Sequence, residues 1–224
     1  MITPINAEKK TSYEQIIEMI RSRRSIRAFK DEAVNKKDIE KIIQGASLAP
    51  SGMNSQSTEF ISIHNKDTLN IIIDLSYQYL AKWIKLLRFP FVKMLARVVM
   101  GREINGVIAY LDEFEIFIKA YKDGHDKISN NAPCLLLFHA NVEAPMADIN
   151  ASLALQNAIY VCEGLGLGCF FPGIILAAAQ NDKKISKLLF LPDNHKIFGV
   201  LAIGYPRFKY RNWIQRFVPK ITWI

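Results

Sequence analysis

The sequence predicts an α+β domain in which a few scattered strands are covered by a larger number of helices. Amphipathic helical stretches dominate the chain, and the apolar strand-like runs at 60–64, 134–140 and 196–204 are separated by very unequal lengths of sequence. That spacing lacks the regular strand–helix alternation of a doubly wound parallel sheet. The chain has 224 residues, of which 50% are hydrophobic, and this is enough to bury the core of a single domain spanning 1–224.

The first part of the chain predicts two helices, a loop and a strand. Residues 12–15 have the Ser-x-x-Gln pattern of a capping box at the start of a helix. Asn35 is placed to cap a second helix with an apolar stripe of helical period, and Pro50 ends that helix. Residues 51–56 read as a polar loop that leads into the strand at 60–64.

The middle and end of the chain predict a long helical region and three further strands. The helical region runs from about Asp67 to Ala120 and is broken near Pro90 and Gly101. The elements expected after it are strand 134–140, a helix at about 146–163, a short strand from Cys169, a short helix at 183–189 and an apolar central strand at 196–204.

The net charge indicates which kinds of molecule the protein binds, and the cysteines indicate the cellular compartment. The formal net charge of +8 favours an anionic partner, which leaves a phosphorylated cofactor, acidic lipid or nucleic acid open. No nucleic-acid recognition motif accompanies the charge, so nucleic acid is not expected. The three cysteines form no CxxC pair, and their number and apolar neighbours favour reduced thiols in a cytoplasmic protein.

The four histidines predict no metal site. They lie at His64, His125, His139 and His195, far apart in the sequence and without the spacing of metal ligands. We expect each of them to have a structural or surface role.

The densest functional signal is the cluster at residues 23–27, which holds three arginines and a serine. If the segment is extended, Arg23, Ser25 and Arg27 face the same side. A guanidinium group presents a planar fork of donors that fits phosphate oxygens. The cluster therefore indicates a site for a phosphorylated ligand, while a solvated basic face is the alternative interpretation.

Four segments of the chain together resemble the flavin (FMN)-dependent nitroreductase family. They are residues 23–29, 49–56, 164–169 and 204–206, the last followed by basic residues. Their order matches the family along nearly the whole chain, except for the stretch between about 77 and 124. The resemblance implies a nitroreductase-like fold with a central, mostly antiparallel sheet surrounded by helices. It also implies an intertwined homodimer with FMN in a groove at the interface.

The resemblance assigns residues from both ends of the chain to the cofactor. Arg23 and Ser25 would hold the phosphate and ribityl end of FMN, and Arg27, the expected catalytic residue, would stabilise negative charge at the N1 and C2-carbonyl side of the ring. The full set of cofactor-binding residues implied by the resemblance is Arg23, Arg24, Ser25, Arg27, Pro50, Ser51, Gly52, Asn54, Gln56, Pro172, Gly173, Arg207, Lys209 and Arg211.

Within that set, the family pattern distributes the contacts between two subunits. Asn54 would hydrogen-bond the ring edge from the same subunit, whereas residues 50–52 would come from the partner. Three basic residues at 207–211 would complete the phosphate site. Pro172 stands where the family usually offers a backbone N–H to flavin N5 and has no N–H itself, so either Gly173 donates or the loop is shifted.

The resemblance implies an NAD(P)H-dependent oxidoreductase that reduces nitroaromatic, quinone or similar electron-poor acceptors by a ping-pong mechanism. The alternatives are a flavoenzyme of the same fold with other chemistry, such as reductive dehalogenation or flavin fragmentation, and reduction by a separate ferredoxin. The chain cannot hold an iron–sulfur cluster of its own, because three dispersed cysteines do not make a four-cysteine ligand set.

A basic, aromatic stretch at 79–102 predicts a helical lid insertion, with bounds at about 77–124. The stretch interleaves lysines and arginines, Arg102 among them, with large apolar residues, and it is too charged to span a membrane. A helix of this kind can also lie on a membrane surface. We favour the lid, which would shape the substrate pocket, over membrane contact or a non-enzymatic membrane-binding protein.

Overall fold

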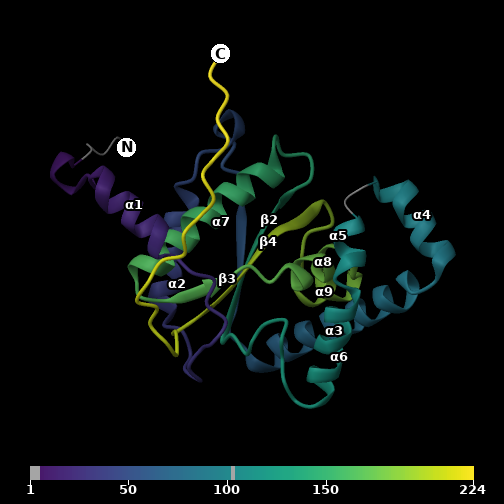
Figure 1. The fold of residues 1–224 in the computed structure, drawn as a ribbon. Helices are drawn as coiled ribbons and strands as arrows, with labels where there is room; N and C mark the ends of the chain where they lie inside the picture. Colours follow the sequence, from purple (N-terminus) through teal and green to yellow (C-terminus); the bar gives the residue numbers. More distant parts are fainter. Residues whose placement is uncertain (1–5, 102–103) are drawn as a thin grey trace.

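A computed structural model describes residues 6–101 and 104–224, and its centre is a four-stranded antiparallel sheet (Figure 1). The strands lie in the order β1-β2-β4-β3. Their bounds are Glu59–Ile63 for β1, Cys134–Asn141 for β2, Gly168–Phe170 for β3 and His195–Gly204 for β4. Helices cover both faces of the sheet, so the predicted α+β class with an antiparallel sheet is confirmed.

One face of the sheet is covered by α2 (Lys36–Ser47) and α7 (Ala147–Gly164). Leu136 and Phe138 of β2 point into this layer, where they pack with Ile42 of α2 and Ala154 of α7. Small residues along α7 allow the helix to lie close to the sheet and to α2. A further helix, α1 (Tyr13–Ser22), lies near the end of α7 and buries none of its own residues.

The opposite face is covered by α3 (Lys66–Leu87), α6 (Leu111–Lys122), α8 (Gly173–Asn181) and α9 (Lys183–Leu188). Leu135 and Leu137 of β2 point into this layer, as the alternation of side chains along a strand requires. Because β2 and β4 are covered on both sides, nearly all of β2 and the second half of β4 are buried, which explains why these stretches read as continuous apolar runs.

The predicted helix starts agree with the structure. Ser12 accepts a hydrogen bond from the Gln15 backbone N–H at 3.3 Å, and the Gln15 side chain accepts one from the Ser12 N–H at 3.0 Å. Asn35 caps α2 through a bond from the Lys37 N–H at 2.9 Å. Two short 3-10 helices, η1 (Ala7–Lys9) and η2 (Gly52–Asn54), complete this part of the chain.

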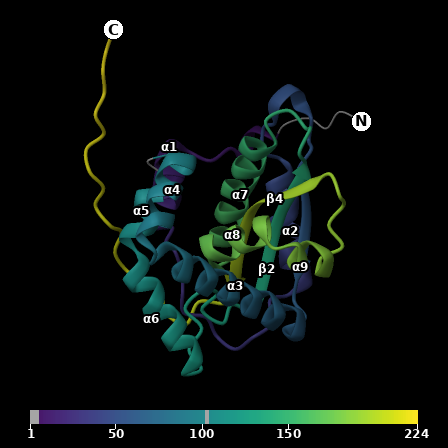
Figure 2. The same ribbon diagram turned by 90° about the vertical axis from the view of Figure 1, so that its right-hand side faces the viewer.

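The expected lower bound of the lid insertion, at about residue 77, does not coincide with the start of a separate element. That boundary falls inside α3, which continues unbroken to Leu87 with its inner face buried. Two helices, α4 (Pro90–Met100) and α5 (Ile104–Ala109), stand off from the sheet (Figure 2). The chain then returns to the body in α6, where Tyr121 stacks on Tyr77 with ring centroids 3.7 Å apart.

The breaks near Pro90 and Gly101 are where the helical region is interrupted, as predicted. Arg102 lies outside the described residues. Along 6–101 and 104–224, the structure has no helix with both the length and the apolar character needed to cross a bilayer.

The last twenty residues form an extended tail, whose first part, up to about residue 213, lies against residues 21–30 and whose remainder leaves the body of the protein. After β4 the segment 205–224 contains a single bridge, between Pro206 and Phe29, and no helix or strand. In both views the tail ends away from the body (Figures 1 and 2). Its large apolar side chains are exposed, with Phe217 and Trp223 at 101% and 88% exposure.

Candidate functional site

The arginine cluster is held in an extended segment against the end of the sheet. Ser25 bridges Cys169 of β3 in parallel, and the Ile26 N–H donates to the Cys169 carbonyl at 3.0 Å. Gly168 makes this approach possible, because a Cβ atom there would lie only 2.6 Å from Ile26 Cγ2. Exposure alternates over 25–27, with Ser25 and Arg27 exposed and Ile26 half-buried, whereas Arg23, the C-cap residue of α1, is half-buried like Arg24. Ser25 and Arg27 thus face the same side, as an extended segment requires, and a common side that includes Arg23 stays a prediction.

The same segment lies beside the chain that follows β4. The Lys30 N–H donates to the Tyr205 carbonyl at 2.9 Å, and the Arg207 N–H donates to the Ala28 carbonyl at 2.9 Å. These two hydrogen bonds fix the start of the 205–224 segment against the arginine cluster. Basic groups from residues 23–27 and 207–211 are thereby brought to one end of the molecule.

Arg24 joins the two segments and carries an unpaired donor. Its Nη2 atom donates to the Asn212 carbonyl at 2.8 Å, and its guanidinium group stacks on the Tyr210 ring at 4.9 Å. Its Nε atom is buried and has no hydrogen-bond partner among the residues that the structure describes. A buried charged donor without an acceptor is unfavourable. The cluster therefore fits an anionic ligand that supplies the missing oxygen.

Arg27 is positioned by an aromatic ring at the end of β3. Its Cζ atom lies 5.3 Å from the ring centroid of Phe170, a distance typical of cation–π contact. The chain continues from Phe170 through Pro172, the N-cap of α8. The first helical hydrogen bond of α8 runs from the Leu176 N–H to the Pro172 carbonyl at 3.1 Å. The N–H of Gly173 therefore has no hydrogen-bond partner within α8. It lies at the N-terminus of the helix, where the helix dipole is positive.

The loop at 50–58 is fixed by a buried amide that the sequence analysis missed. Asn150 of α7, only 2% exposed, accepts a hydrogen bond from the Gly52 N–H at 2.9 Å. Its Nδ2 atom donates to the Pro145 carbonyl at 2.8 Å and to the hydroxyls of Ser55 and Ser57, both at 3.3 Å. The sequence signal for this role is an asparagine in the first turn of an Ala-rich helix, because a polar side chain that is buried needs hydrogen-bond partners.

The loop is tightly turned around this amide. Met53, Asn54 and Gln56 all have positive φ, at 54°, 52° and 48°, an uncommon conformation for residues other than glycine that persists when the surroundings hold it. Gly52 lies so close to Met146 that a Cβ atom would meet its sulfur at 2.9 Å. A small cavity of about 110 Å³ lies between this loop, α2 and α7.

The two groups of candidate residues lie at opposite ends of the subunit. Helix α7 runs between them, with Asn150 in its first turn beside the 50–58 loop. Glu163 in its last turn accepts a hydrogen bond from the Ser22 hydroxyl at 3.1 Å, next to the arginine cluster. The rise of an α-helix separates these two positions by about 20 Å. One chain therefore does not bring the whole predicted set together.

A sequence profile described as Nitroreductase family matches residues 20–205. The chain belongs to the nitroreductase family. Among curated proteins, a nitroreductase-family relative from Archaeoglobus fulgidus, provisionally named NADH dehydrogenase/NAD(P)H nitroreductase, is 26% identical over 194 residues, which cover 87% of each chain. An FMN reductase [NAD(P)H] of Bacillus subtilis is 25% identical over 86% of this chain and 66% of its own length.

Solved structures of the nitroreductase fold resemble this one. A nitroreductase with bound FMN from Bacteroides fragilis has a TM-score of 0.66 at 19% identity, covering 94% of this chain and 98% of that one. An iodotyrosine deiodinase structure with FMN and 3-iodo-L-tyrosine has a TM-score of 0.67 at 20% identity, covering 92% and 97%. The predicted nitroreductase-like fold is confirmed.

The placement of Asn54 bears on one expectation drawn from the family pattern, which put Asn54 and residues 50–52 on different subunits. Asn54 lies in the same turn as Ser51 and Gly52, because its N–H donates to the Ser51 carbonyl at 3.0 Å. Its place is thus at the end of the subunit opposite Arg27, and not with Arg27 in the same subunit. In this nitroreductase-family chain, the candidate residues divide into the end group Arg23, Arg24, Ser25, Arg27, Pro172, Gly173, Arg207, Lys209 and Arg211, and the loop group Pro50, Ser51, Gly52, Asn54 and Gln56.

Proposed function

We propose that this chain is an FMN-dependent oxidoreductase, with FMN bound at the arginine end of one subunit and covered by the 50–56 loop of a second. The observation that carries this proposal is the junction of the two basic segments around Arg24, whose buried Nε lacks an acceptor among the described residues. Family membership supplies the class of ligand, and relatives named for FMN support it.

The phosphate of FMN fits the junction of the two basic segments. Arg23 and Arg24 approach from one strand-like segment, and Arg207, Lys209 and Arg211 belong to the other. Guanidinium groups bind phosphate oxygens through two parallel hydrogen bonds, and these are stronger than bonds between neutral groups. An oxygen on the Arg24 Nε would remove a buried unpaired donor, which costs about 1–3 kcal/mol or more.

The ring of FMN fits between Arg27 and the start of α8. When bound, FMN supplies two-electron transfer between a nicotinamide donor and an electron-poor acceptor. Phe170 fixes the Arg27 guanidinium, which would stabilise negative charge that develops at the N1 edge of the ring. Because α8 begins at Gly173, the Gly173 N–H is our choice for the N5 donor, and Pro172 serves as the N-cap.

A homodimer completes the site. The loop group lies about 20 Å from the arginine end along α7, so a second copy would bring its loop to the first copy's flavin. Exposed apolar side chains occur where such a partner would pack, on α1, the 48–53 loop, α7 and the tail. They are Ile16, Ile20, Leu48, Met53, Ile149, Leu153, Trp213, Ile214, Phe217, Val218, Ile221, Trp223 and Ile224.

NAD(P)H is the proposed electron donor, and nitroaromatic or quinone compounds are the proposed acceptors. The NAD(P)H-linked names of the relatives support the donor, and a separate ferredoxin is the alternative. The exposed apolar face of α4, which includes Phe91 and Val98, supports a lid over the acceptor. We place the enzyme in the cytoplasm because all three cysteines are free and buried thiols.

Reductive dehalogenation is a second candidate activity. Iodotyrosine deiodinases are among the curated relatives, and the mouse protein is 22% identical over 89% of this chain and 65% of its own length. The two activities use the same flavin site and differ in the acceptor that the lid admits.

The first test is FMN binding by the purified protein, followed by absorbance and titration. We expect a yellow protein that binds FMN, and an Arg24→Gln variant with at least tenfold weaker affinity, since a charged hydrogen bond is worth about 1.5–3 kcal/mol. Lys187→Gln, which removes an equal charge from the exposed face of α9, should bind FMN normally. A protein that takes up no FMN contradicts the proposal.

The second test compares donors and acceptors. Reduction of the bound flavin is followed with NADH, NADPH and reduced ferredoxin, and turnover with a nitroaromatic, a quinone and a halogenated phenol. Turnover of the nitroaromatic or quinone with NAD(P)H supports the main proposal. Dehalogenation without nitroreduction supports the second candidate instead. Salt-sensitive co-sedimentation with anionic liposomes would show membrane contact by the protein, the alternative to a lid role for the basic, aromatic stretch.

A further inference from the structure

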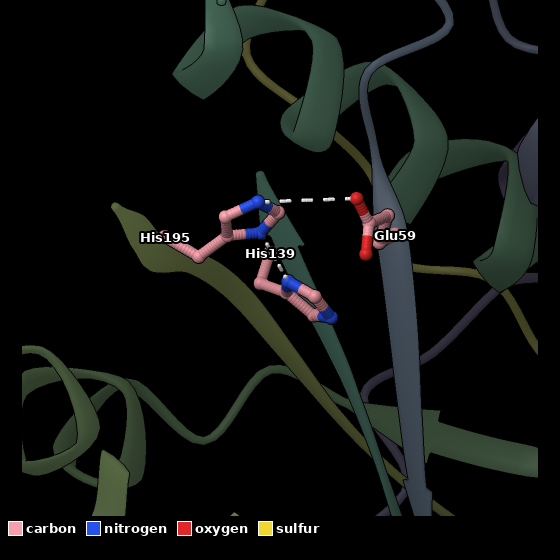
Figure 3. Close-up of side chains that lie close together, drawn as sticks. All are labelled: Glu59, His139 and His195. Atoms are coloured by element: carbon pink, nitrogen blue, oxygen red, sulfur yellow. Dashed lines mark hydrogen bonds and ion pairs between the residues drawn. The ribbon is translucent and has the colours of Figure 1, made fainter. Parts of the chain in front are cut away.

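Three side chains that are far apart in the sequence meet at the end of the sheet opposite the arginine cluster. Glu59 is the first residue of β1, His195 is the first residue of β4, and His139 lies near the end of β2 between them. In the strand register Glu59 pairs with His139, and His195 pairs with Asn141. Figure 3 shows the three side chains directed toward one another. Strand pairing thus creates a cluster that sequence spacing alone did not indicate.

The two imidazole rings face each other through their Nδ1 atoms. The Nδ1 of His139 and the Nδ1 of His195 are 2.9 Å apart, and the rings are tilted by 53° (Figure 3). A β-bulge between Phe138 and His139 shifts the register here, and such bulges re-aim side chains. At least one of the facing nitrogens must offer a lone pair, because a hydrogen bond needs one donor and one acceptor.

A carboxylate completes the cluster. The Glu59 Oε1 atom lies 3.9 Å from the Nε2 of His195, and one ligand atom from each of the three residues lies within 4.8 Å of the others. His139 is only 4% exposed, whereas the Glu59 side chain is 60% exposed. The imidazole pair is therefore fixed by packing, while the carboxylate can adjust its position without disturbing the core.

We propose that Glu59, His139 and His195 bind a first-row divalent transition metal, for which Zn²⁺ is the reference ion. Two imidazole nitrogens and one carboxylate oxygen make a three-residue donor set that leaves a fourth position for water. Hard cations such as Mg²⁺ and Ca²⁺ prefer six or more oxygen ligands, so this set does not suit them.

The imidazole pair needs only a small adjustment to reach zinc coordination, and the exposed Glu59 carboxylate, which now lies nearest the Nε2 of His195, would have to turn toward the two Nδ1 atoms. With Zn–N bonds of about 2.0–2.1 Å and tetrahedral angles, two nitrogen ligands lie about 3.3 Å apart. The facing Nδ1 atoms, now 2.9 Å apart, would open by a few tenths of an ångström. The proton shared between them moves to an Nε2 atom, so neutral imidazoles bind the ion without losing a proton. One Nδ1–H bond is exchanged for an Nε2–H bond, and no bond between heavy atoms of the protein is made or broken.

An ion at this position would tie together the ends of three strands and the loop that precedes β1. Glu59 directly follows Thr58, which lines the small cavity beside the 50–58 loop. An ion that binds only the folded state raises the free energy of unfolding by RT ln(1 + c/Kd), where c is the free ion concentration, so thermal stability rises with the logarithm of c above Kd. The bound ion would therefore stabilise the folded subunit at the end where the 50–58 loop lies. This effect does not depend on flavin binding.

The test is Zn²⁺ binding to the full-length, tag-free protein after treatment with EDTA. We expect calorimetry to give one ion per chain and thermal unfolding to shift upward with Zn²⁺. Affinity should fall by at least about tenfold in Glu59→Gln, where a ligand is lost and the packing is untouched, and in His195→Gln. His125→Gln, which alters an exposed histidine outside the cluster, is the matched control and should bind normally.

Co²⁺ provides a spectroscopic readout, because a tetrahedral Co²⁺ site absorbs at longer wavelength than a flavin. His139 is buried, so if His139→Gln does not fold, the Glu59 and His195 variants still decide the question. The absence of stoichiometric Zn²⁺ uptake overturns the proposal. So does uptake that survives both variants, or uptake lost only in His64→Gln, where an imidazole lies 3.9 Å from the Cys134 thiol.

Discussion

Substitution of Gly168 by alanine tests how the arginine cluster is held against the sheet. The new Cβ would lie 2.6 Å from Ile26 Cγ2 and 2.8 Å from Ile26 Cβ. These atoms belong to the branched part of the side chain next to the backbone, so no rotation of a flexible end relieves the contact. The segment must move away, and it then loses the 3.0 Å bond from the Ile26 N–H to the Cys169 carbonyl.

The expected cost follows from those two effects. Overpacking in a well-packed site costs about 1–3 kcal/mol, and a lost backbone hydrogen bond costs about 0.5–1.5 kcal/mol. Gly168→Ala should therefore lower the free energy of unfolding by about 2–4 kcal/mol, a large part of the stability of a typical domain. The displacement should also weaken FMN binding by at least about tenfold, because Arg24 and Arg27 move with the segment.

The assay is urea unfolding together with FMN titration, and the chain offers a matched control. Gly164, the last residue of α7, has no atom within 4 Å of its would-be Cβ. Gly164→Ala should leave FMN affinity unchanged, and stability should stay the same or rise by up to about 1 kcal/mol. If Gly168→Ala matches Gly164→Ala in both measurements, the close approach of residues 25–27 to β3 is not what builds the site.

Three further predictions concern single side chains. Arg27→Ala should slow reduction of the bound flavin by a factor that corresponds to about 3 kcal/mol in stopped-flow measurements, and an unchanged rate would remove Arg27 from its role. Asn150→Leu should cost about 1–3 kcal/mol in urea unfolding, because the half-buried Gly52 N–H loses its acceptor, and wild-type stability would count against that role. Burial raises the pKa of the Cys134 thiol to about 12, so the folded state keeps a proton that the unfolded chain loses above about pH 9. The free energy of unfolding should therefore fall by about 1.4 kcal/mol per pH unit from pH 9 toward 12. Cys134→Ala should make this pH dependence less steep. An unchanged slope in that variant would show that the thiol is not its cause.

Local sequence signals were sufficient for most of the secondary structure. Ser12 and Asn35 identify helix starts because their side chains bond to N–H groups only a few residues away. Pro90 marks a helix break for a similarly local reason, since it lacks an N–H and begins a new helix. Helix α8 was not predicted, because its short apolar sequence after Pro172 carries no capping side chain and no clear period.

The lid boundary shows where local patterns stop being informative. The basic and aromatic residues after Tyr77 suggested an exposed insertion, yet α3 continues to Leu87. Its inner face packs against α6 and α8, and an amphipathic helix looks the same in sequence whether its apolar stripe meets the core or a ligand.

The candidate site could be predicted only in its composition. The motif residues can be named from the sequence, but their division between two ends of the subunit depends on α7, whose length separates Asn150 from Glu163. The meeting of His139 with His195 likewise depends on strand order and a bulge. Contacts of this kind are set by register, which a single sequence does not reveal.

The most direct test of the shared flavin site is a mixed dimer of two defective chains. Arg24→Ala removes the phosphate end, and Gly52→Leu disrupts the loop, because a side chain there would meet Met146 at 2.9 Å. Each variant alone should bind little FMN. After the two are unfolded together and refolded, our account predicts that mixed dimers regain one intact site each, which appears as restored flavin absorbance. Flavin absorbance no higher than that of the separate variants would contradict a site built from two subunits.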